Sequence, residues 1–430
     1  MRVLVIGGGG REHAIVRGLA ADPSVSELHA APGNPGIAGL AEVQAVSASE
    51  PSDVLRVATR VAADLVVIGP EAPLVAGVAD ALRAAGIAVF GPDGAAARIE
   101  GSKAFAKEVM AAGGIPTAQA RVAATRAEAE DALKAFGPPY VVKDDALAAG
   151  KGVVVTEDFA VALAHAASCE RVVIEEYLDG PEVSLFAVAD GRSAVPLLAA
   201  QDFKRAHDGD LGPNTGGMGA YLPLPWAPPG LSDEVLATVV KPAIDELARR
   251  GTPYRGLLYA GLALTAKGVK VVEFNARFGD PETQVVLDRL ATPLAGLLHA
   301  SAVGDLAAVP ALTWHPGAAV TVVIAAAGYP EAPAKGDVIT VRDLPGDTAG
   351  PGDTGPGSTG PGDTAGYLLH AGTALDGGDL VTAGGRVLNA VGSGPDLAAA
   401  RAAAYAIAER VEFRGGWYRR DIAERASAGA

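Results

Sequence analysis

The first hundred residues alternate short apolar runs with helical patterns, and this alternation limits the possible folds of the chain more than composition does. Runs rich in β-branched residues lie at 3–6, 65–68 and 87–90, and helix signals separate them. Such alternation predicts strand–helix–strand units, which build a parallel sheet covered by helices. We therefore expect a parallel α/β domain at residues 1–101.

A glycine-rich turn, GGGGREH, follows the first predicted strand. Open α/β sheets bind ligands beyond the carboxyl ends of their strands, and backbone N–H groups at a helix N-terminus attract phosphate. The turn lacks the third glycine of the dinucleotide fingerprint, and no acid ends the second strand about twenty residues later. The pattern therefore favours a phosphate site over a redox cofactor, with a plain tight turn as the alternative.

The remaining chain divides where the pattern changes. A second α/β unit is predicted at 102–190, with a mobile flap within 121–190, where two short strands flank the small-residue loop LAAGKG. Residues 191–325 are predicted to form a central α+β part, and 326–430 a small β-rich domain. A tandem Pro-Gly-Asp-Thr repeat at 345–366 has no large apolar residue, so we expect a disordered insertion there.

Composition excludes several classes of function. Asp and Glu number 50 against 35 for Lys and Arg, and the net charge of -15 disfavours nucleic acid and anionic membranes as partners. Cys169 is the only cysteine, which fits a reducing compartment. The N-terminus lacks a signal-peptide pattern and no apolar window is long enough to span a bilayer, so we expect a cytoplasmic protein.

The segment 271–284, VVEFNARFGDPETQ, predicts a cation site at the end of a strand. Glu273 and Asn275 are two residues apart, so their side chains share one face of the strand. Carboxylate and amide oxygens suit Mg²⁺, which completes its shell with nucleotide phosphates. Arg277 and Asp280 could hold a second anion and orient it, although a solvated strand end remains the alternative for the segment alone.

Lysines and acids elsewhere complete this pattern. Lys103 opens a helix that Ser102 is expected to cap, Lys143 ends a predicted strand, and Lys151 lies in the small-residue loop. A strand ending in Glu175 and Glu176 follows. The loop lacks P-loop spacing, so the set indicates an ATP site built between two sheets.

This arrangement resembles the ATP-grasp fold, and the chain is similar over nearly its whole length to the phosphoribosylamine–glycine ligases of purine biosynthesis. Seven motifs carry the resemblance in family order: GGREHA at 9–14, GPEAPL at 69–74, GSKAFAK at 101–107, LAAGKGV at 147–153, GPNTGGMGAY at 212–221, EFNARFGDPETQ at 273–284 and HAGTALDGG at 370–378.

The resemblance implies a set of contacts with ATP and a metal ion. Lysines and the flap loop would contact the phosphates, through Lys103, Lys143, Gly150, Lys151 and Gly152. A hinge would read the adenine edge, at Glu175, Glu176, Tyr177 and Leu178, and Glu182 would hold the ribose hydroxyls. Glu273 and Asn275 would be the ligands of Mg²⁺ or Mn²⁺.

The resemblance also implies a substrate pocket. The first glycine turn, with Gly9, Gly10 and Arg11, would hold the 5-phosphate of phosphoribosylamine. A second loop would face both glycine and phosphoribosylamine, at Asn214, Thr215, Gly216 and Gly217. The expected catalytic residues are Lys143, Arg277 and Asp280, with Arg277 also at the substrate. For His13, capping or packing is at least as plausible as substrate contact, and a monomer is expected.

The reaction implied has two steps: ATP phosphorylates the glycine carboxylate, and the amine of phosphoribosylamine then displaces phosphate. Positioning and charge neutralisation carry such phosphoryl transfer, so no protein nucleophile is needed. In place of the family's usual Lys-Ala-Asp-Gly, residues 143–146 read Lys-Asp-Asp-Ala, which could weaken the use of ATP. An ATP-grasp enzyme that uses bicarbonate or formate, and a homologue that only binds nucleotide, remain alternatives.

Overall fold

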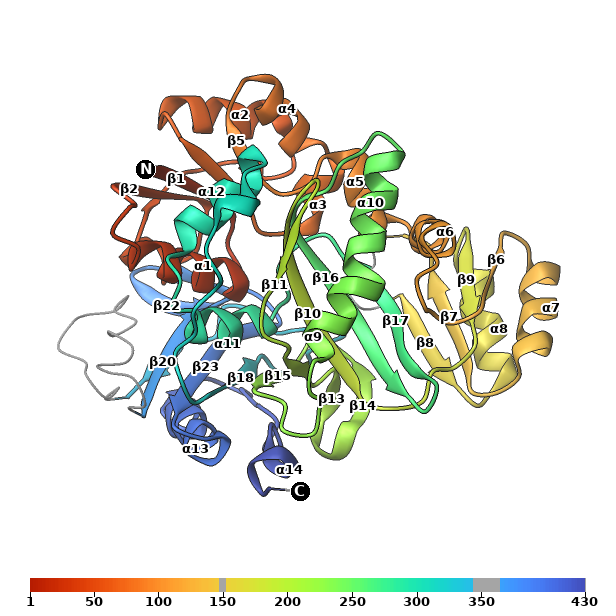
Figure 1. Ribbon diagram of the computed structural model, residues 1–430. Coiled ribbons are helices and arrows are strands. Elements are labelled where there is room, and N and C mark those ends of the chain that lie inside the picture. Colours follow the sequence, from red (N-terminus) through yellow and green to blue (C-terminus); the bar gives the residue numbers. More distant parts are fainter. Residues whose placement is uncertain (147–151, 343–363, 430) are drawn as a thin grey trace.

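The computed structural model describes residues 1–146, 152–342 and 364–429. Three sheets and their helices form the body of the molecule, and a fourth sheet forms a lobe at its side (Figure 1). Among the described residues, no helix has the length and apolar character that a membrane crossing requires.

The N-terminal sheet is parallel throughout, with strand order β3-β2-β1-β4-β5, as the alternating pattern predicted. Its strands are β1 (Arg2–Gly7), β2 (Glu27–Pro32), β3 (Glu42–Val43), β4 (Leu65–Ile68) and β5 (Ala88–Phe90). The helices are α1 (Gly10–Ala20), α2 (Pro51–Arg60), α3 (Glu71–Val75), α4 (Val78–Ala84) and α5 (Gly94–Gly101). Helix α1 begins directly after the first glycine turn, which places that turn at the carboxyl end of β1.

The lobe is an antiparallel sheet of order β6-β9-β7-β8 with two helices (Figure 1). Helix α6 (Lys103–Gly113) leads into it. The lobe contains β6 (Ala120–Ala123), α7 (Arg126–Phe136), β7 (Tyr140–Asp144), β8 (Val153–Thr156), α8 (Phe159–Ser168) and β9 (Val172–Glu175). Its buried residues, such as Leu133, Val142 and Ile174, form a core separate from those of the body.

A four-stranded antiparallel sheet of order β11-β10-β16-β17 lies at the centre. Its strands are β10 (Glu182–Asp190), β11 (Ala194–Pro196), β16 (Arg255–Thr265) and β17 (Gly268–Asn275). A helical segment packs nearby, formed by α9 (Leu231–Val235), a π-helical stretch (Leu236–Val240) and α10 (Lys241–Arg249). Two further helices, α11 (Glu282–Arg289) and α12 (Leu294–Val303), follow β17.

The third body sheet has the order β12-β15-β18-β23-β20. Its strands are β12 (Gln201–Asp202), β15 (Gly219–Leu222), β18 (Ala318–Ala325), β20 (Ala365–His370) and β23 (Arg386–Gly394), covered by α13 (Leu397–Ala408). Smaller pairs are β13 (Arg205–His207) with β14 (Leu211–Asn214), β19 (Thr340–Val341) with β24 (Val411–Glu412), and β21 (Thr373–Asp376) with β22 (Asp379–Thr382). The short helix α14 (Glu424–Ser427) lies near the C-terminus.

Hydrogen-bonded strands cross two of the domain boundaries drawn from sequence. Strand β18 pairs with β15 on one side and with β23 on the other, so a boundary at 325/326 divides one sheet. Strand β10 pairs with β16, so a boundary at 190/191 divides another. The sequence pattern marks where elements lie along the chain, but not which distant strands become neighbours.

The expected insertion at 345–366 needs a correction at its end. Ala365 and Gly366 belong to β20 and pair with Ser393 and Gly392 of β23. A Cβ at Gly366 would lie 2.6 Å from a side-chain carbon of Ile407, so α13 packs directly on this glycine. Residues 345–363 of the expected insertion lie outside the described residues.

Candidate active site

The two expected metal ligands lie at the end of β17. Glu273 pairs with Gly261 of β16, so the neighbouring strand places no side chain opposite the carboxylate. Burial acts to raise the pKa of Glu273, but Lys204, Lys143 and Lys103 outweigh that effect and lower it. Asn275 pairs with Tyr259, and its Oδ1 accepts a 3.4 Å hydrogen bond from Arg277.

The two expected phosphate-binding lysines reach Glu273 from the lobe and from α6. Lys143, on β7, is buried and bonds the carbonyl oxygen of Val272 at 2.9 Å. Lys103, at the start of α6, bonds the carbonyl oxygens of Asp144 and Ala146 at 2.7 and 3.0 Å. Burial lowers the pKa of Lys103 below its ordinary value, although Glu273 opposes the shift. Strand β7 of the lobe and helix α6 therefore each bring one lysine to the carboxylate.

The side chain of Glu175, which is expected in the adenine hinge, holds two lysines. The buried carboxylate forms ion pairs with Lys107 and Lys143, both at 2.8 Å. These contacts fix Lys143 between β9 and β17. Burial lowers the pKa of Lys107 below its ordinary value, although Glu175 opposes the shift.

The rest of the expected hinge continues from β9 toward the central sheet. The carboxylate of Glu176 accepts the N–H of Gln119 and pairs with Lys270, both at 3.0 Å. Tyr177 is 51% exposed and Leu178 is half-buried, so these two side chains lie near the surface beside the hinge backbone. Gly152 is buried and its carbonyl accepts the N–H of Asp144. Gly150 and Lys151 lie outside the described residues.

Glu182, the expected ribose ligand, is exposed at the start of β10 and pairs with Lys204 at 2.5 Å. Burial acts to lower the pKa of Lys204, but Glu182 and Asp202 raise it well above its ordinary value. Burial raises the pKa of Asp202 to about 7, with Lys204 opposing and Glu282 adding to the shift. A lysine and several acids therefore extend the site beyond Glu273.

Arg277 lies between the central sheet and the N-terminal domain. Its guanidinium pairs with Glu71 at 3.2 Å and with Glu100 at 3.1 Å. Burial acts to lower the pKa of Arg277, but both acids raise it. Glu100 also accepts the backbone N–H of Ala276 at 2.6 Å, which fixes the turn after β17. Arg277 therefore anchors this turn to the N-terminal domain.

The expected substrate loop lies beside Asp280. Thr215 is buried and its hydroxyl bonds the carbonyl oxygen of Lys204 at 2.9 Å. Gly217 has a φ of +107°, and a Cβ there would lie 2.5 Å from Cδ of Pro281. That backbone conformation and that contact both require glycine. Asn214 ends β14, and Gly216 is exposed.

The first glycine turn is close to Asp280 as well. A Cβ at Gly9 would lie 3.8 Å from Oδ2 of Asp280, so the turn and the substrate loop border one region. The N–H of Gly9 already donates a 2.7 Å hydrogen bond to the Glu12 carboxylate. Arg11 is buried and bonds Glu12 and the carbonyl oxygen of Phe278. Its guanidinium thus ties the turn to the backbone after β17. Gly10 packs against the side chain of Asn389.

His13 packs at the boundary between the N-terminal and C-terminal parts. It is fully buried, and its Nδ1 accepts the N–H of His370 at 2.8 Å. These contacts support the packing role for His13.

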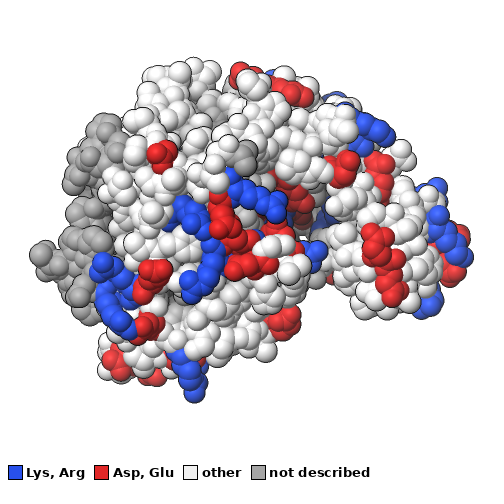
Figure 2. All heavy atoms as spheres, turned by 90° about the horizontal axis from the view of Figure 1, so that it is seen from below, with Lys and Arg blue, Asp and Glu red and all other residues white. Residues whose placement is uncertain are grey.

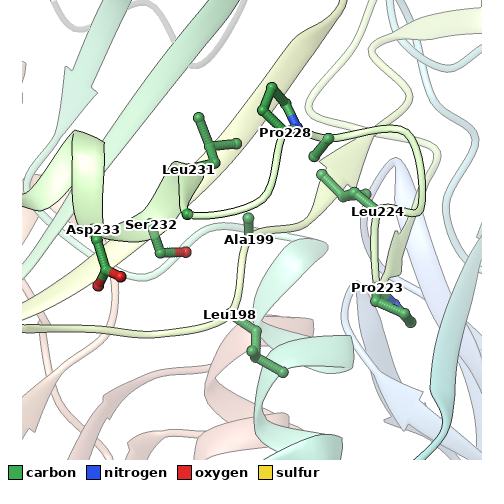
Figure 3. A pocket seen from close by; sticks show the side chains of 10 residues that line it. Leu198, Ala199, Pro223, Leu224, Pro228, Leu231, Ser232 and Asp233 are labelled. Carbon is green, nitrogen blue, oxygen red and sulfur yellow. The ribbon is translucent and has the colours of Figure 1, made fainter.

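Charged side chains gather where these elements meet. Seen from below, basic and acidic residues lie together beside the hollow that separates the lobe from the body (Figure 2). A separate pocket of about 350 Å³ contains none of the expected site residues (Figure 3). Its lining is mostly apolar and unsuited to a triphosphate: Leu198, Ala199, Pro223, Leu224, Ala227, Pro228, Gly230, Leu231, Ser232 and Asp233.

Family models match three consecutive parts of the chain. They are described as the N domain of phosphoribosylglycinamide synthetase (residues 1–100), its ATP-grasp (A) domain (101–283) and its C domain (319–425). The phosphoribosylamine–glycine ligase of Streptomyces coelicolor is 60% identical, over 99% of this chain and all of that protein. The chain belongs to the phosphoribosylglycinamide synthetase family. The ligase of Corynebacterium ammoniagenes is 55% identical, over all of this chain and 99% of that one.

Solved structures agree with the family in fold. The phosphoribosylamine–glycine ligase of Thermotoga maritima has a TM-score of 0.81 and 35% identity, covering 98% of this chain and all of that one. A biotin carboxylase of Campylobacter jejuni, solved as a β-γ-ATP complex, has a TM-score of 0.71 at 14% identity, covering 97% of this chain and 93% of that one. The second likeness shows the fold alone. The expected ATP-grasp fold, with its N-terminal parallel domain and C-terminal domain, is thus confirmed.

ATP-grasp enzymes bind ATP together with a divalent metal ion, and the residues of this synthetase-family chain fit such an ion. Within the described ranges, the Glu273 carboxylate has no hydrogen bond or ion pair of its own, and no three His, Cys, Asp or Glu side chains cluster as a metal site. Mg²⁺ commonly takes one or two protein oxygens and fills its shell with phosphates and water. Glu273 and Asn275 match that pattern.

Several residues around the site escaped the sequence analysis. Asp202 and Lys204 lie two apart in a short extended segment, and that shared face is a signal that could have identified them. Glu100 and Arg386 had no such signal, because their partners lie more than 100 residues away along the chain. Glu71 lies in the GPEAPL motif, but its partner Arg277 is just as distant.

Proposed function

We propose that this chain uses ATP to ligate glycine to 5-phosphoribosylamine, giving glycinamide ribonucleotide, ADP and phosphate through glycyl phosphate. Family membership supports the reaction. The observation that carries the proposal at the site is the meeting of two lysines beside Glu273: Lys143 donates to the carbonyl oxygen of Val272, the residue before it, and Lys103 donates to the carbonyl oxygen of Asp144, the residue after Lys143. Together with Lys204 they lower the pKa of Glu273. Lysines facing a carboxylate that has no direct partner among the described residues suit a triphosphate on one side and a cation on the other.

In the first step a carboxylate oxygen of glycine attacks the γ-phosphorus and ADP leaves. Lys103 and Lys143 would neutralise the triphosphate as point charges, and Glu175 would hold Lys143 in place for that purpose. Glu273 and Asn275 would hold Mg²⁺, or Mn²⁺, which supplies further neutralisation of the phosphates. Glu175, Glu176, Tyr177 and Leu178 would bind adenine, and Glu182 the ribose.

In the second step the amine nitrogen attacks the acyl carbon, the carbon–oxygen bond to phosphate breaks, and the nitrogen loses a proton. The loop with Asn214, Thr215, Gly216 and Gly217 would bind glycine and phosphoribosylamine beside Asp280. Gly9 and Gly10 would bind the 5-phosphate, with Arg11 as the buried support of that turn. Arg277 would act on the acyl phosphate while tied to Glu71 and Glu100.

A steady-state assay tests the proposal. Purified protein is incubated with Mg-ATP, glycine and freshly made phosphoribosylamine, and ADP release is followed. Release that requires both co-substrates supports the synthetase. Release with bicarbonate in place of glycine would favour a carboxylating relative, and no release would favour a nucleotide-binding homologue.

We also propose that the chain works as a monomer. Sedimentation at assay concentration tests this. A stable dimer whose dissociation abolishes ADP release would contradict it.

A further inference from the structure

Arg386 joins three segments that are far apart in the sequence. It is the first residue of β23, and its Nη1 donates to the carbonyl oxygens of Gly216 and Asp280. Its Nη2 forms a 3.0 Å ion pair with the Asp280 carboxylate. The C-terminal sheet thus reaches both the substrate loop and the turn after β17.

A second residue, Tyr329, holds the same loop through the other backbone polar group of Gly216. The hydroxyl of Tyr329 accepts the N–H of Gly216 at 3.0 Å. A Cβ at Gly216 would lie 3.0 Å from Cζ of Arg386, so the guanidinium lies against this backbone. A Cβ at Gly385 would lie 2.2 Å from the Tyr329 ring, so the tyrosine also depends on a glycine. The C-terminal part therefore binds both backbone polar groups of Gly216, its N–H and its carbonyl oxygen.

Asp280 links this loop to the N-terminal glycine turn. Its Oδ1 accepts a 2.7 Å hydrogen bond from Gln284, and its Oδ2 meets Arg386 near Gly9. The side chain of Asp280 is 16% exposed and that of Arg386 21%, so the pair is largely shielded from water. Charge-assisted hydrogen bonds in such surroundings hold geometry well.

We propose that Arg386 is a positioning residue for phosphoribosylamine. It fixes the substrate loop and Asp280 as one wall that faces the first glycine turn, and it acts through these groups because its guanidinium is engaged by Gly216 and Asp280. The proposed ATP site lies at β17, β7 and α6, and the hydrogen bonds and ion pair of Arg386 within the described residues are with Gly216, Gly217 and Asp280 instead. The inference rests on the proposed function and deepens it, because it assigns the C-terminal part to one of the three substrates.

The test compares Arg386→Gln with Arg386→Lys in the full-length enzyme. For Arg386→Gln we expect the KM for phosphoribosylamine to rise about tenfold or more, with the KM for ATP changed less than about twofold. Arg386→Lys keeps the charge and should recover part of the loss. Tyr329→Phe, a milder change that removes the other backbone contact of Gly216, should raise the same KM by a smaller factor.

Arg342→Gln is the matched control, because Arg342 lies in the same part of the chain and, among the described residues, its ion pair is with the exposed Glu412. We expect no change in any KM for it. An unchanged KM for phosphoribosylamine in Arg386→Gln would overturn the inference. So would an equal rise for all three substrates, or the same loss in Arg342→Gln. Wild-type protein that releases no ADP with both co-substrates would instead refute the proposed function. If Arg386→Gln does not fold, Arg386→Lys and Tyr329→Phe decide the question.

Discussion

Glu273 is a carboxylate that no neighbouring strand covers and toward which three lysines and an arginine direct positive charge. Replacing it with Gln keeps the size of the side chain and removes one charge. Because the metal would lose its charged protein ligand, we expect turnover to fall about 100-fold or more. ADP release, measured across a Mg²⁺ titration, checks this.

Glu412→Gln provides the comparison, since Glu412 is an exposed acid of the C-terminal part. It should retain wild-type turnover, and both variants should melt near the wild-type temperature. Near-normal turnover of Glu273→Gln at saturating Mg²⁺ would contradict the metal assignment.

His370 makes stability depend on pH. Burial lowers the pKa of His370 to about 4, below the ordinary value of 6.5. Below pH 6.5 the unfolded chain takes up a proton that the folded chain refuses, so stability falls as pH drops from about 6.5 toward 4, by at most about 3 kcal/mol. The neighbouring His13, whose pKa burial also lowers, adds to the same trend.

Melting temperatures measured between pH 4 and 8 test this expectation. His370→Gln removes one titrating group and should lose stability less steeply in acid than the wild type. His315→Gln changes an exposed histidine and should follow the wild-type curve. Parallel curves for wild type and His370→Gln would show that His370 does not drive the acid sensitivity.

At the scale of single elements, helix caps connect local sequence to the site. The hydroxyl of Ser102 accepts the N–H of Phe105 and so caps α6, which presents Lys103. Ser102→Ala should destabilise the protein by about 1 kcal/mol. It should also raise the KM for ATP several-fold, because the first turn that orients Lys103 loosens. Urea unfolding and ATP kinetics measure the two effects.

Thr125→Ala is a matched control, because Thr125 caps α7, a helix of the same length, 11 residues, that carries no expected site residue. We expect a similar loss of stability with an unchanged KM for ATP. An equal rise in that KM for both variants would mean that the cap of α6 acts only through general stability.

Local patterns made these elements predictable. Ser102 predicted the start of α6, and runs of β-branched residues predicted β1 and β4. The shared face of Glu273 and Asn275 follows from strand geometry alone. The ion pairs of Arg277 with Glu71 and Glu100, and of Arg386 with Asp280, join segments more than 100 residues apart. Such contacts arise only when tertiary packing selects partners, so local periodicity could not reveal them.

At the scale of the whole molecule, sheet pairing shows how the parts depend on one another. Strands β18 and β23 join residues from either side of the boundary at 325/326, and Arg277 ties the central part to the N-terminal domain. The lobe has a core of its own, separate from those of the body. We therefore expect the body to unfold as one unit and the lobe to respond more independently.

Deleting residues 346–363 tests where the repeat ends. Its composition cannot support a core, so the deletion should leave ADP release unchanged and the melting temperature within about 2 °C. Extending the deletion through Gly366 removes the first two residues of β20 and the contact of Gly366 with α13, and should lower the melting temperature clearly. Equal effects of the two deletions would contradict this boundary.

The most direct test of the whole account is a crystal structure with Mn²⁺ and a non-hydrolysable ATP analogue, using the anomalous signal of manganese. We predict a manganese peak about 2.2 Å from oxygens of Glu273 and Asn275, with the triphosphate extending from it to Lys103 and Lys143. A manganese peak elsewhere, or a triphosphate bound away from these lysines, would contradict the account.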